Sequence, residues 1–330
     1  MSVFVEPVFT GYYKASPLTL VDVGASGGLD VHLRRAEKYM QLIGFEPDEK
    51  AFNDLVAKNN PNSRFFNVAL FDKQTDIDYL ITRKQTASSI FKPNMALREP
   101  FQLPDEFDII KTVKMKTDSL DSIGQKNGIT NIDFIKLDTQ GSELFILKGA
   151  EHFLNDSIFG IEVEVEFSPI YIDQPLFWEV DAYLIQKGFA LFNMGLVRWA
   201  RRNSADKMTK GQLMTADAIY FKRADEVARI VNRYGTAVEK KAKVAKTISI
   251  CLMYGHYDYA LELLFLLPDL FTKEESDAAA KIIRSKMSRR WDFPDFRGRW
   301  ALARLFYRLW SIIEPCNNRW NSFDNNLARF

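Results

Sequence analysis

The stretch Leu18-Thr-Leu-Val-Asp22-Val-Gly24-Ala-Ser-Gly27-Gly28-Leu-Asp30 decides the fold of this chain. Its first six residues are apolar or β-branched apart from Asp22, which is typical of a buried strand, and three glycines follow. A helical pattern begins near Val31. Strand, glycine loop and helix in this order predict a ligand cradle, because glycine permits positive φ and lets a ligand approach the backbone amides. An ordinary βα turn with a chance excess of glycine is the alternative.

The spacing of this loop differs from that of a dinucleotide-binding loop. It reads G-x-x-G-G from Gly24, and Asp22 precedes the first glycine by two residues. A carboxylate there would repel a pyrophosphate and suits a ligand that carries an ammonium and a sulfonium, as S-adenosylmethionine does. Met40 to Phe45 predicts a second strand, and Glu46 follows it at the position where nucleotide-binding α/β domains bind ribose hydroxyls. We therefore expect two carboxylates to bracket one nucleoside.

The composition indicates a soluble globular protein with a large core, since 47% of the 330 residues are hydrophobic and 26% are charged. The two cysteines have no CxxC spacing and fit a reducing compartment. We find no signal peptide and no apolar run long enough for a membrane span, so we expect a cytoplasmic protein. The net charge is only +1, and we expect no nucleic-acid partner.

Strands alternate with helical patterns up to about residue 222, which predicts a Rossmann-like, doubly wound α/β domain with a mainly parallel sheet. Phe189 to Met194 and Ala216 to Phe221 predict an antiparallel closing pair, with a basic loop from Arg198 to Lys210 between them. Beyond this point helical periodicity continues to the end of the chain. We therefore expect one domain over residues 1–222 and an all-α extension over 223–330.

Five further segments are predicted inside the first domain. Thr82 to Pro104 is predicted as a long loop, either functional or a surface excursion, and Ala69 to Asp72 as a short loop before a strand at 77–82. A short strand is predicted at 113–115. The strand Phe159 to Phe167 carries Glu162, Glu164 and Glu166 on one face. Because three buried carboxylates are costly, this face is predicted to be wet, paired with cations or part of a site; a plain solvent-exposed face is the alternative.

The extension is the basic part of the chain, with 19 Lys and Arg against 13 Asp and Glu from residue 223 onward. Helical patterns are predicted over 227–253 and 259–267. In the last predicted helix, Arg297 to Ile313, three arginines (Arg297, Arg304 and Arg308) share one face, and Leu302, Leu305, Phe306, Leu309 and Ile313 share the opposite one. Either the helix docks on its own domain, or it contacts an anionic membrane or glycolipid surface.

Residues 18–222 resemble the FkbM-type methyltransferases, a family with the class I S-adenosylmethionine-dependent fold. The matching motifs are Val21-Asp-Val-Gly-Ala25, Gly44-Phe-Glu-Pro47, Asn67-Val-Ala-Leu70, Ile132-Asp-Phe-Ile-Lys136-Leu-Asp138-Thr-Gln-Gly-Ser-Glu143 and Leu147-Lys-Gly-Ala150. The resemblance implies methyl transfer to a hydroxyl, commonly of a sugar or a secondary metabolite. It also implies cofactor contacts: Asp22 and Gly24 at the methionine end, Glu46 at the ribose, and Asn67, Val68 and Ala69 at the adenine, with Ala25, Gly27, Pro47 and Asp138 completing the candidate site.

The candidate catalytic residues are Asp138, Glu164 and Lys136. In-line displacement requires that the acceptor oxygen be aligned and its proton removed. A hydroxyl acceptor agrees with the sequence, because Asp138-Thr-Gln140-Gly stands where methyltransferases of base amino groups carry Asn/Asp-Pro-Pro-Tyr. In an alternative mechanism, Asp138 and Glu164 hold a divalent cation that acidifies the acceptor hydroxyl. Asp138 also suits a helix N-cap, Lys136 suits a solvent-reaching position beside the helix layer, and the role of Gln140 stays open because some family members carry an acid there.

Two other classes of function stay open at this point. A scaffold that retains the cofactor fold without turnover would act through its helical tail. An NAD-dependent oxidoreductase is disfavoured by the glycine spacing and by Asp22. The expected partner of the enzyme is a small-molecule or glycan acceptor, such as a surface polysaccharide or a glycolipid. The sequence leaves open a peripheral membrane contact through the last helix, and a homo-oligomer.

Overall fold

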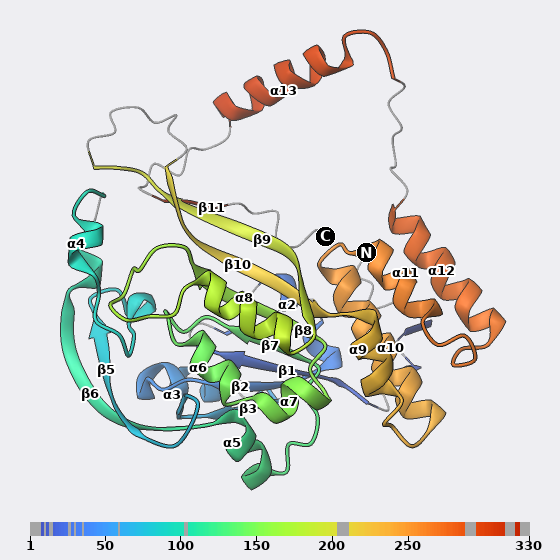
Figure 1. Ribbon diagram of the computed structural model, residues 1–330, viewed down its shortest axis with the longest axis horizontal. Helices are drawn as coiled ribbons and strands as arrows, with labels where there is room; N and C mark the ends of the chain where they lie inside the picture. Colours follow the sequence, from blue (N-terminus) through green and yellow to red (C-terminus); the bar gives the residue numbers. More distant parts are fainter. Residues whose placement is uncertain are drawn as a thin grey trace.

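The computed structural model describes residues 8–9, 11–12, 16–25, 28–29, 31–34, 36–58, 60–101, 105–202, 211–287, 295–313 and 321–323. The strands of its main sheet are β1 (Leu18–Val23), β2 (Met40–Phe45), β3 (Ser63–Phe66), β7 (Phe134–Leu137), β8 (Gly160–Glu166), β9 (Phe189–Trp199), β10 (Gln212–Lys222) and β11 (Asn321–Phe323). They lie in the order β11-β9-β10-β8-β7-β1-β2-β3. Strands β8 to β3 in this order are parallel, and β10, β9 and β11 are antiparallel to their neighbours (Figure 1). The predicted mainly parallel sheet and its antiparallel closing pair are confirmed.

Four helices cover one face of this sheet: α5 (Leu120–Asn127), α6 (Glu143–Lys148), α7 (Glu151–Asp156) and α8 (Phe177–Gln186). Their apolar side chains share a core with alternate residues of the strands, among them Val21, Ile135 and Ile161. The sequence fixes the start of α5, because the Ser119 hydroxyl accepts a hydrogen bond from the amide of Ser122. All six residues of β1 are buried, as a strand at the centre of a covered sheet requires.

The opposite face is covered by helices from the extension: α9 (Ala224–Val231), α10 (Ala237–Met253), α11 (Tyr257–Phe265) and α12 (Lys273–Met287). Leu20 and Phe134 of the sheet share a core with Ile248 of α10. The predicted continuous helix over 227–253 is wrong: it is broken between α9 and α10, where Thr236 and Glu239 form a capping box that starts a new helix. The domain division at residue 222 stays a prediction, and helices beyond it complete the sheet's second layer.

A second, small sheet in the order β4-β6-β5 lies beside the main one and consists of β4 (Ala69–Leu70), β5 (Asp76–Thr82) and β6 (Ile109–Asp118). Two expectations are wrong here. Residues 69–70 form a strand because they pair with Thr117 and Asp118, and the strand predicted at 113–115 is ten residues long because it pairs along the whole of β5. The remaining short elements are α2 (Val31–Arg34), η2 (Glu37–Tyr39), α3 (Glu49–Ala57), η3 (Gln85–Ala87), α4 (Met95–Arg98) and η4 (Asp105–Phe107).

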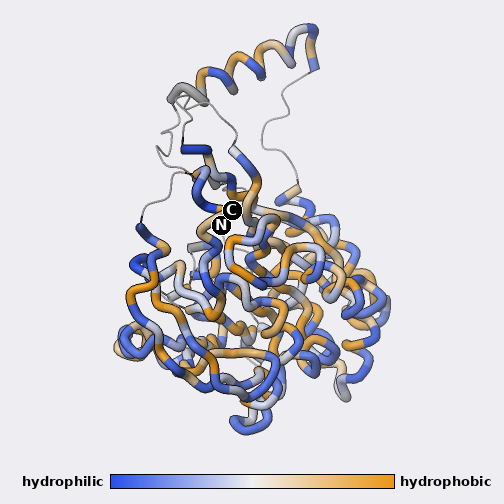
Figure 2. Tube along the Cα trace, turned by 60° about the vertical axis from the view of Figure 1, so that its left-hand side comes forward, coloured by the Kyte–Doolittle hydropathy of each residue, from blue (hydrophilic) through white to orange (hydrophobic). Residues whose placement is uncertain are grey.

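The last helix, α13 (Arg299–Ile313), stands away from the body of the molecule (Figures 1 and 2). Its described apolar side chains are exposed, including Trp300 at 77% and Phe306 at 62%. The expectation that this helix docks on its own domain is therefore wrong for the described side chains. Of the predicted basic loop over 198–210, residues 203–210 lie outside the described part. Within the described part, no helix combines the length and apolar character that crossing a membrane requires.

Candidate active site

A cavity of about 380 Å³ opens at the carboxyl edge of the parallel strands, within the usual size of a small-molecule site. Its walls come from the ends of β1, β2, β7 and β8, from the small sheet, and from residues 84–90. We call the part beside β1 and β2 the β2 end, lined by Gly24, Glu46, Pro47, Asp48, Val68, Ala69 and Tyr79. The part beside β8 and β9 is the β9 end, lined by Phe107, Glu164, Glu166, Tyr171, Val197, Trp199 and Thr215. Asp138, at the tip of β7, lies between them.

The backbone of the β2 end is packed so closely that one position requires glycine. Gly24 has a φ of +82°, and a Cβ on it would lie 2.1 Å from the carbonyl oxygen of Asp138. The glycine loop therefore passes directly against the end of β7. Glu46 is buried, and its carboxylate accepts a hydrogen bond from the amide of Asp48 at 2.9 Å. The Asn67 side chain holds this loop by donating to the carbonyls of Glu46 and Pro47, at 2.9 and 3.1 Å.

The residues predicted to bind a cofactor divide into two groups. Gly24, Glu46, Pro47, Val68, Ala69 and Asp138 line the cavity. Asp22, Ala25 and Asn67 lie behind its wall: Asp22 and Ala25 are buried, and Asn67 contacts the loop as described. Gly27 lies outside the described residues. The sequence thus identified the wall of the cavity at the β2 end, together with part of its support.

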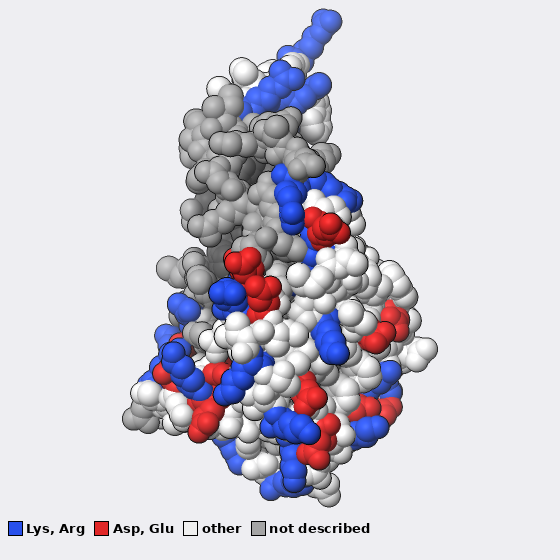
Figure 3. All heavy atoms as spheres, turned by 90° about the vertical axis from the view of Figure 1, so that its left-hand side faces the viewer, with Lys and Arg blue, Asp and Glu red and all other residues white. Residues whose placement is uncertain are grey.

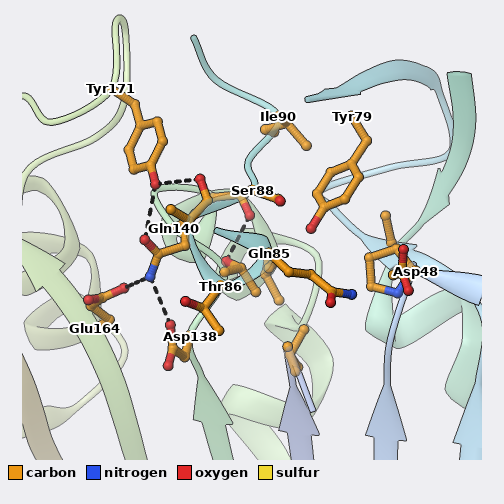
Figure 4. Close-up of a pocket in the computed structure, with 18 of the residues that line it drawn as sticks. Asp48, Tyr79, Gln85, Thr86, Ser88, Ile90, Asp138, Gln140, Glu164 and Tyr171 are labelled. Atoms are coloured by element: carbon orange, nitrogen blue, oxygen red, sulfur yellow. Dashed lines mark hydrogen bonds between the residues drawn. The ribbon is translucent and has the colours of Figure 1, made fainter. Parts of the chain in front are cut away.

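Gln140 joins the two candidate carboxylates. Its amide nitrogen donates to Asp138 Oδ1 at 3.1 Å and to Glu164 Oε2 at 2.5 Å, and its amide oxygen faces the Tyr171 hydroxyl at 3.0 Å (Figure 4). The backbone of Gln140 has a φ of 59°, an unusual conformation for a residue with a side chain, which costs energy unless the surroundings fix it. Ser89 supports it by donating to its carbonyl at 2.7 Å. The side chain that the sequence left without a role therefore aligns Asp138 with Glu164.

Acidic groups crowd the β9 end and alter each other's protonation. Burial, reinforced by the charge of Asp138, raises the pKa of Glu164 well above its ordinary value, and burial with the charges of Glu143 and Asp138 does the same for Glu166. Burial also raises the pKa of Glu143 to about 7, against the hydrogen bonds it accepts from Thr139. Of these acids, Glu164 and Glu166 line the cavity, and shifted acids in a cavity are typical of a reaction centre.

The glutamate face of β8 is neither exposed nor uniform, so the solvent-exposed alternative is wrong. Glu162 is buried and its carboxylate lies 3.1 Å from His32 Nε2, and it also accepts a hydrogen bond from the Tyr254 hydroxyl. Burial opposes ionisation of Glu162, but the hydrogen bond and charge of His32 and the charge of Lys136 hold its pKa below the ordinary value. Glu164 and Glu166 line the cavity. The strand face thus divides into a paired part and a site part.

Lys136 lies beside this acidic row, on the strand that ends at Asp138. Its side chain is 12% exposed, and its Nζ lies 3.8 Å from Asp138 Oδ2. In the sheet Lys136 is in register with Asp22 on β1 and with Glu162 on β8, so three charged residues stand side by side. Lys136 does not line the cavity. The geometry gives it an electrostatic influence on Asp138 rather than contact with a reacting group.

Aromatic rings form the wall of the β9 end. Phe107, Tyr171 and Trp199 line it, and Phe107 and Trp199 pack with their centroids 6.3 Å apart. Behind them the buried guanidinium of Arg98 stacks on Phe107, with 3.1 Å between its Cζ and the ring centroid. Burial lowers the pKa of Arg98 to about 10. A flat, partly polar surface of this kind suits a ring-shaped ligand.

Sequence reasoning missed Tyr79 and Trp199, whereas the cavity residues of segment 84–90 lie in the loop 82–104, for which a functional role was one of two alternatives. Tyr79 lines the cavity from β5, and burial with the charges of Glu46 and Asp48 raises its pKa. These residues reach the site through the small sheet and through contacts between distant segments, which leave no local pattern. Trp199 ends the observed strand β9, but it lay in the predicted basic loop, beyond the predicted end of the strand at Met194. No three His, Cys, Asp or Glu side chains among the described residues are grouped to hold a metal ion.

A model of the FkbM methyltransferase domain matches residues 22–191, which is more than half of the chain and includes the glycine loop, Glu46, Asp138 and Glu164. The chain belongs to the FkbM methyltransferase family. The predicted resemblance is thereby confirmed, and with it the class I S-adenosylmethionine-dependent fold. The cofactor of this family is S-adenosylmethionine.

Known proteins similar to this FkbM-family chain are distant. One is the 2-O-methyltransferase NoeI of Sinorhizobium fredii (strain NBRC 101917 / NGR234), 26% identical over 152 residues, which are 44% of this chain and 62% of that protein. The chain thus spans less than two thirds of that relative. Among solved structures, a TehB-like methyltransferase from Corynebacterium glutamicum is 12% identical, with 66% of this chain and 88% of that one covered and a TM-score of 0.28. A precorrin-6y C5,15-methyltransferase from Geobacter metallireducens is 9% identical, with 65% and 87% covered and a TM-score of 0.34.

Proposed function

We propose that this enzyme is an O-methyltransferase that acts on a hydroxyl of a sugar or glycan. The cofactor occupies the β2 end of the cavity, and the acceptor occupies the β9 end. The observation that carries the proposal is the bridge from Gln140 to Asp138 and Glu164, which orients two carboxylates between the two ends. The relative NoeI is named as a 2-O-methyltransferase, which supports an oxygen acceptor.

The residues of the β2 end fit S-adenosylmethionine. Gly24 lines the cavity and lets the loop pass against the end of β7, and the buried carboxylate of Glu46 is placed to accept hydrogen bonds from ribose hydroxyls. Val68 and Ala69, from the segment held by Asn67, offer apolar contact to a purine. Asp22 and Asp138 place negative charge near a ligand that carries two positive groups. When bound, the cofactor supplies a methyl group on a positively charged sulfur.

Asp138 is our candidate for the group that receives the proton of the acceptor hydroxyl. Its side chain is 44% exposed, so a hydroxyl in the cavity can reach it, and the hydrogen bond from Gln140 fixes one of its oxygens. Glu164, whose pKa is raised by burial and by the charge of Asp138, lines the cavity and can form a hydrogen bond with a second oxygen of the acceptor. Lys136 supports the charge of Asp138 from behind the wall.

The β9 end has the chemistry that a sugar ring requires. The faces of Phe107 and Trp199 offer flat apolar contact, while Glu166 and Thr215 offer polar partners for hydroxyls. A secondary metabolite with a hydroxylated ring shares this chemistry, and we put the sugar first because the β9 end combines aromatic faces with several polar partners for hydroxyls.

The proposal is tested by methyl transfer from isotopically labelled S-adenosylmethionine to a panel of monosaccharides, oligosaccharides and extracted glycolipids. We expect label on a sugar oxygen, lost in Asp138→Asn and retained in Asp78→Asn, a matched change on the exposed face of β5. Transfer only to amine or carboxyl acceptors would contradict it. Dialysis against a chelator, with Mg²⁺ added back, distinguishes a carboxylate base from a cation held by Asp138 and Glu164.

A further inference from the structure

The helix α13 has an apolar face that nothing in the described part of the molecule covers. Leu305, Phe306 and Leu309 are 52%, 62% and 46% exposed, and Trp300 is 77% exposed. Figure 2 shows hydrophobic residues recurring between hydrophilic ones along a helix that stands apart from the body. Large apolar side chains exposed together on one element mark an interaction surface.

The charge of this helix is of one sign. Residues 297–313 contain four arginines and no Asp or Glu. At about 100° per residue, Arg297, Arg304 and Arg308 lie within about 40° of one another, and Leu302, Phe306 and Leu309 lie on the opposite side. Leu305 lies at the edge of that apolar side, and Arg299 lies beside Phe306. Arg304 and Arg308 are exposed, and Figure 3 shows Lys and Arg side chains at the projecting upper end of the molecule. The helix is therefore amphipathic and its polar side is cationic.

The charge pattern decides between the candidate occupants of this face. Two copies of α13 packed through their apolar sides would leave Arg297, Arg304 and Arg308 of each copy facing outward, with no acidic side chain in residues 297–313 to pair with them. An anionic lipid surface offers an apolar interior to the leucines and phenylalanine, and phosphates to the arginines, at the same time. It is the occupant that satisfies both sides of the helix.

We propose that α13 is a membrane anchor that lies in the headgroup region of an anionic bilayer, parallel to its surface. The apolar side, with Leu302, Leu305, Phe306 and Leu309, enters the boundary between headgroups and acyl chains, and Trp300 lies at that interface. Arg304 and Arg308 contact lipid phosphates. The ligand class is a phospholipid of net negative charge, and the binding is peripheral and sensitive to salt.

The chain after α13 connects this anchor to the β9 end of the cavity. Strand β11 pairs with β9 so that Asn321 is opposite Trp199 and Phe323 is opposite Val197, and both β9 residues line the cavity. Seven residues lie between Ile313 and Asn321, and these eight Cα–Cα steps allow at most about 28 Å between anchor and strand. If the proposed function holds, the acceptor end of the cavity faces a surface on which a lipid-linked glycan is presented; this last step rests on that function.

Vesicle binding by the full-length protein tests the anchor independently of activity. The probes are vesicles of phosphatidylcholine alone and of phosphatidylcholine with phosphatidylglycerol, separated by flotation at low and at high salt. We expect flotation with the phosphatidylglycerol vesicles at low salt, and a loss at high salt. Neutralising two surface arginines in Arg304→Gln/Arg308→Gln should weaken binding about 30-fold, from about 1 kcal/mol for each. Leu305→Ser/Phe306→Ser should weaken it further.

The matched control is Lys281→Gln/Arg284→Gln, which removes the same charge from exposed positions on α12 and should leave vesicle binding unchanged. An absence of flotation by the wild-type protein at low salt would overturn the proposal. So would equal binding by the α13 and α12 variants, which would place the contact elsewhere, or a dimer in sedimentation that dissociates in Leu305→Ser/Phe306→Ser. Cofactor binding measured on the same samples shows separately whether the proposed function fails.

Discussion

Two aspartates flank the four residues of β7, and they are used in opposite ways. Asp133, at the amino end, is 1% exposed and pairs with two buried lysines of α10, Lys243 and Lys246, the second at 2.8 Å. Burial opposes its ionisation, but the two lysines hold its pKa far below the ordinary value. Asp138, at the carboxyl end, has a side chain 44% exposed to the cavity, and the acids around it have raised pKa values.

The surroundings of the two aspartates suit different roles: Asp133 holds the fold together, and Asp138 faces the cavity. At the amino edge a buried acid is matched by cations from another element, so its charge fastens α10 to the sheet and is unavailable to a ligand. At the carboxyl edge the acids are aligned by an amide, Gln140, and share one cavity. In the proposed function these acids serve substrate binding and proton transfer.

The largest effect is expected at the carboxyl end of β7. Asp138→Asn keeps the shape of the side chain but removes the base, so kcat should fall about 10² to 10⁴-fold. The thermal midpoint should stay within a degree or two of the wild type, because this side chain is not packed in the core. Steady-state kinetics and a melting curve measure the two quantities. A kcat within twofold of the wild type would show that Asp138 is not the base.

The reverse result is expected at the amino end. Asp133→Asn leaves Lys243 and Lys246 buried without their carboxylate, and should lower the free energy of unfolding by about 3–5 kcal/mol. Because the pKa of Asp133 is depressed, its contribution is complete above the pKa of an unfolded aspartate, about 3.8, and is lost as the pH falls below it. Urea denaturation of wild type and variant should therefore differ most at neutral pH and converge in acid.

A smaller effect is expected at the β2 end of the cavity, where we propose that the cofactor binds. Glu46→Gln retains an oxygen that can accept from the amide of Asp48 but removes the charge, so affinity for S-adenosylmethionine should fall about ten- to a hundredfold with little change in stability. The matched control is Glu49→Gln, at the exposed first residue of α3. If both variants bind the cofactor as the wild type does, Glu46 is not a ribose ligand.

The smallest effect sharpens the role of the amide between the acids. Gln140→Leu removes the hydrogen bonds to Asp138 and Glu164, and should lower kcat about tenfold while leaving cofactor affinity unchanged. Gln140→Asn, which keeps the amide on a shorter side chain, should recover part of the loss. A change in cofactor affinity as large as that in kcat would mean that Gln140 supports the β2 end instead.

The parts of the molecule that local sequence determines were predictable. Asp22, Gly24 and Glu46 stand at fixed positions after or within apolar strands, and parallel pairing of β1 with β2 and β7 brings their ends to one edge. Asp138 was found in the same way, from the end of β7. These predictions needed only strand periodicity and the rule that α/β sheets bind ligands at the carboxyl edge.

What could not be predicted depends on contacts between distant segments. Tyr171 contacts Gln140, which is 31 residues away in the sequence, and Trp199 packs against Phe107, which is further away still. The pairing of Asp133 with Lys243 spans 110 residues and needs the whole of α10 to fold onto the sheet. The exposure of α13 was missed because its amphipathic pattern is the same whether the apolar face packs on protein or on lipid.

The central claim is that the β2 end of the cavity binds S-adenosylmethionine. Isothermal titration of the folded protein with S-adenosylmethionine, with its demethylated product, and with NAD as a control tests it most directly. We expect one binding site for the first two ligands, with affinity weakened in Glu46→Gln and retained in Asp78→Asn. We expect no heat of binding from NAD. If folded protein binds neither S-adenosylmethionine nor its demethylated product, or binds NAD in their place, the claim is contradicted.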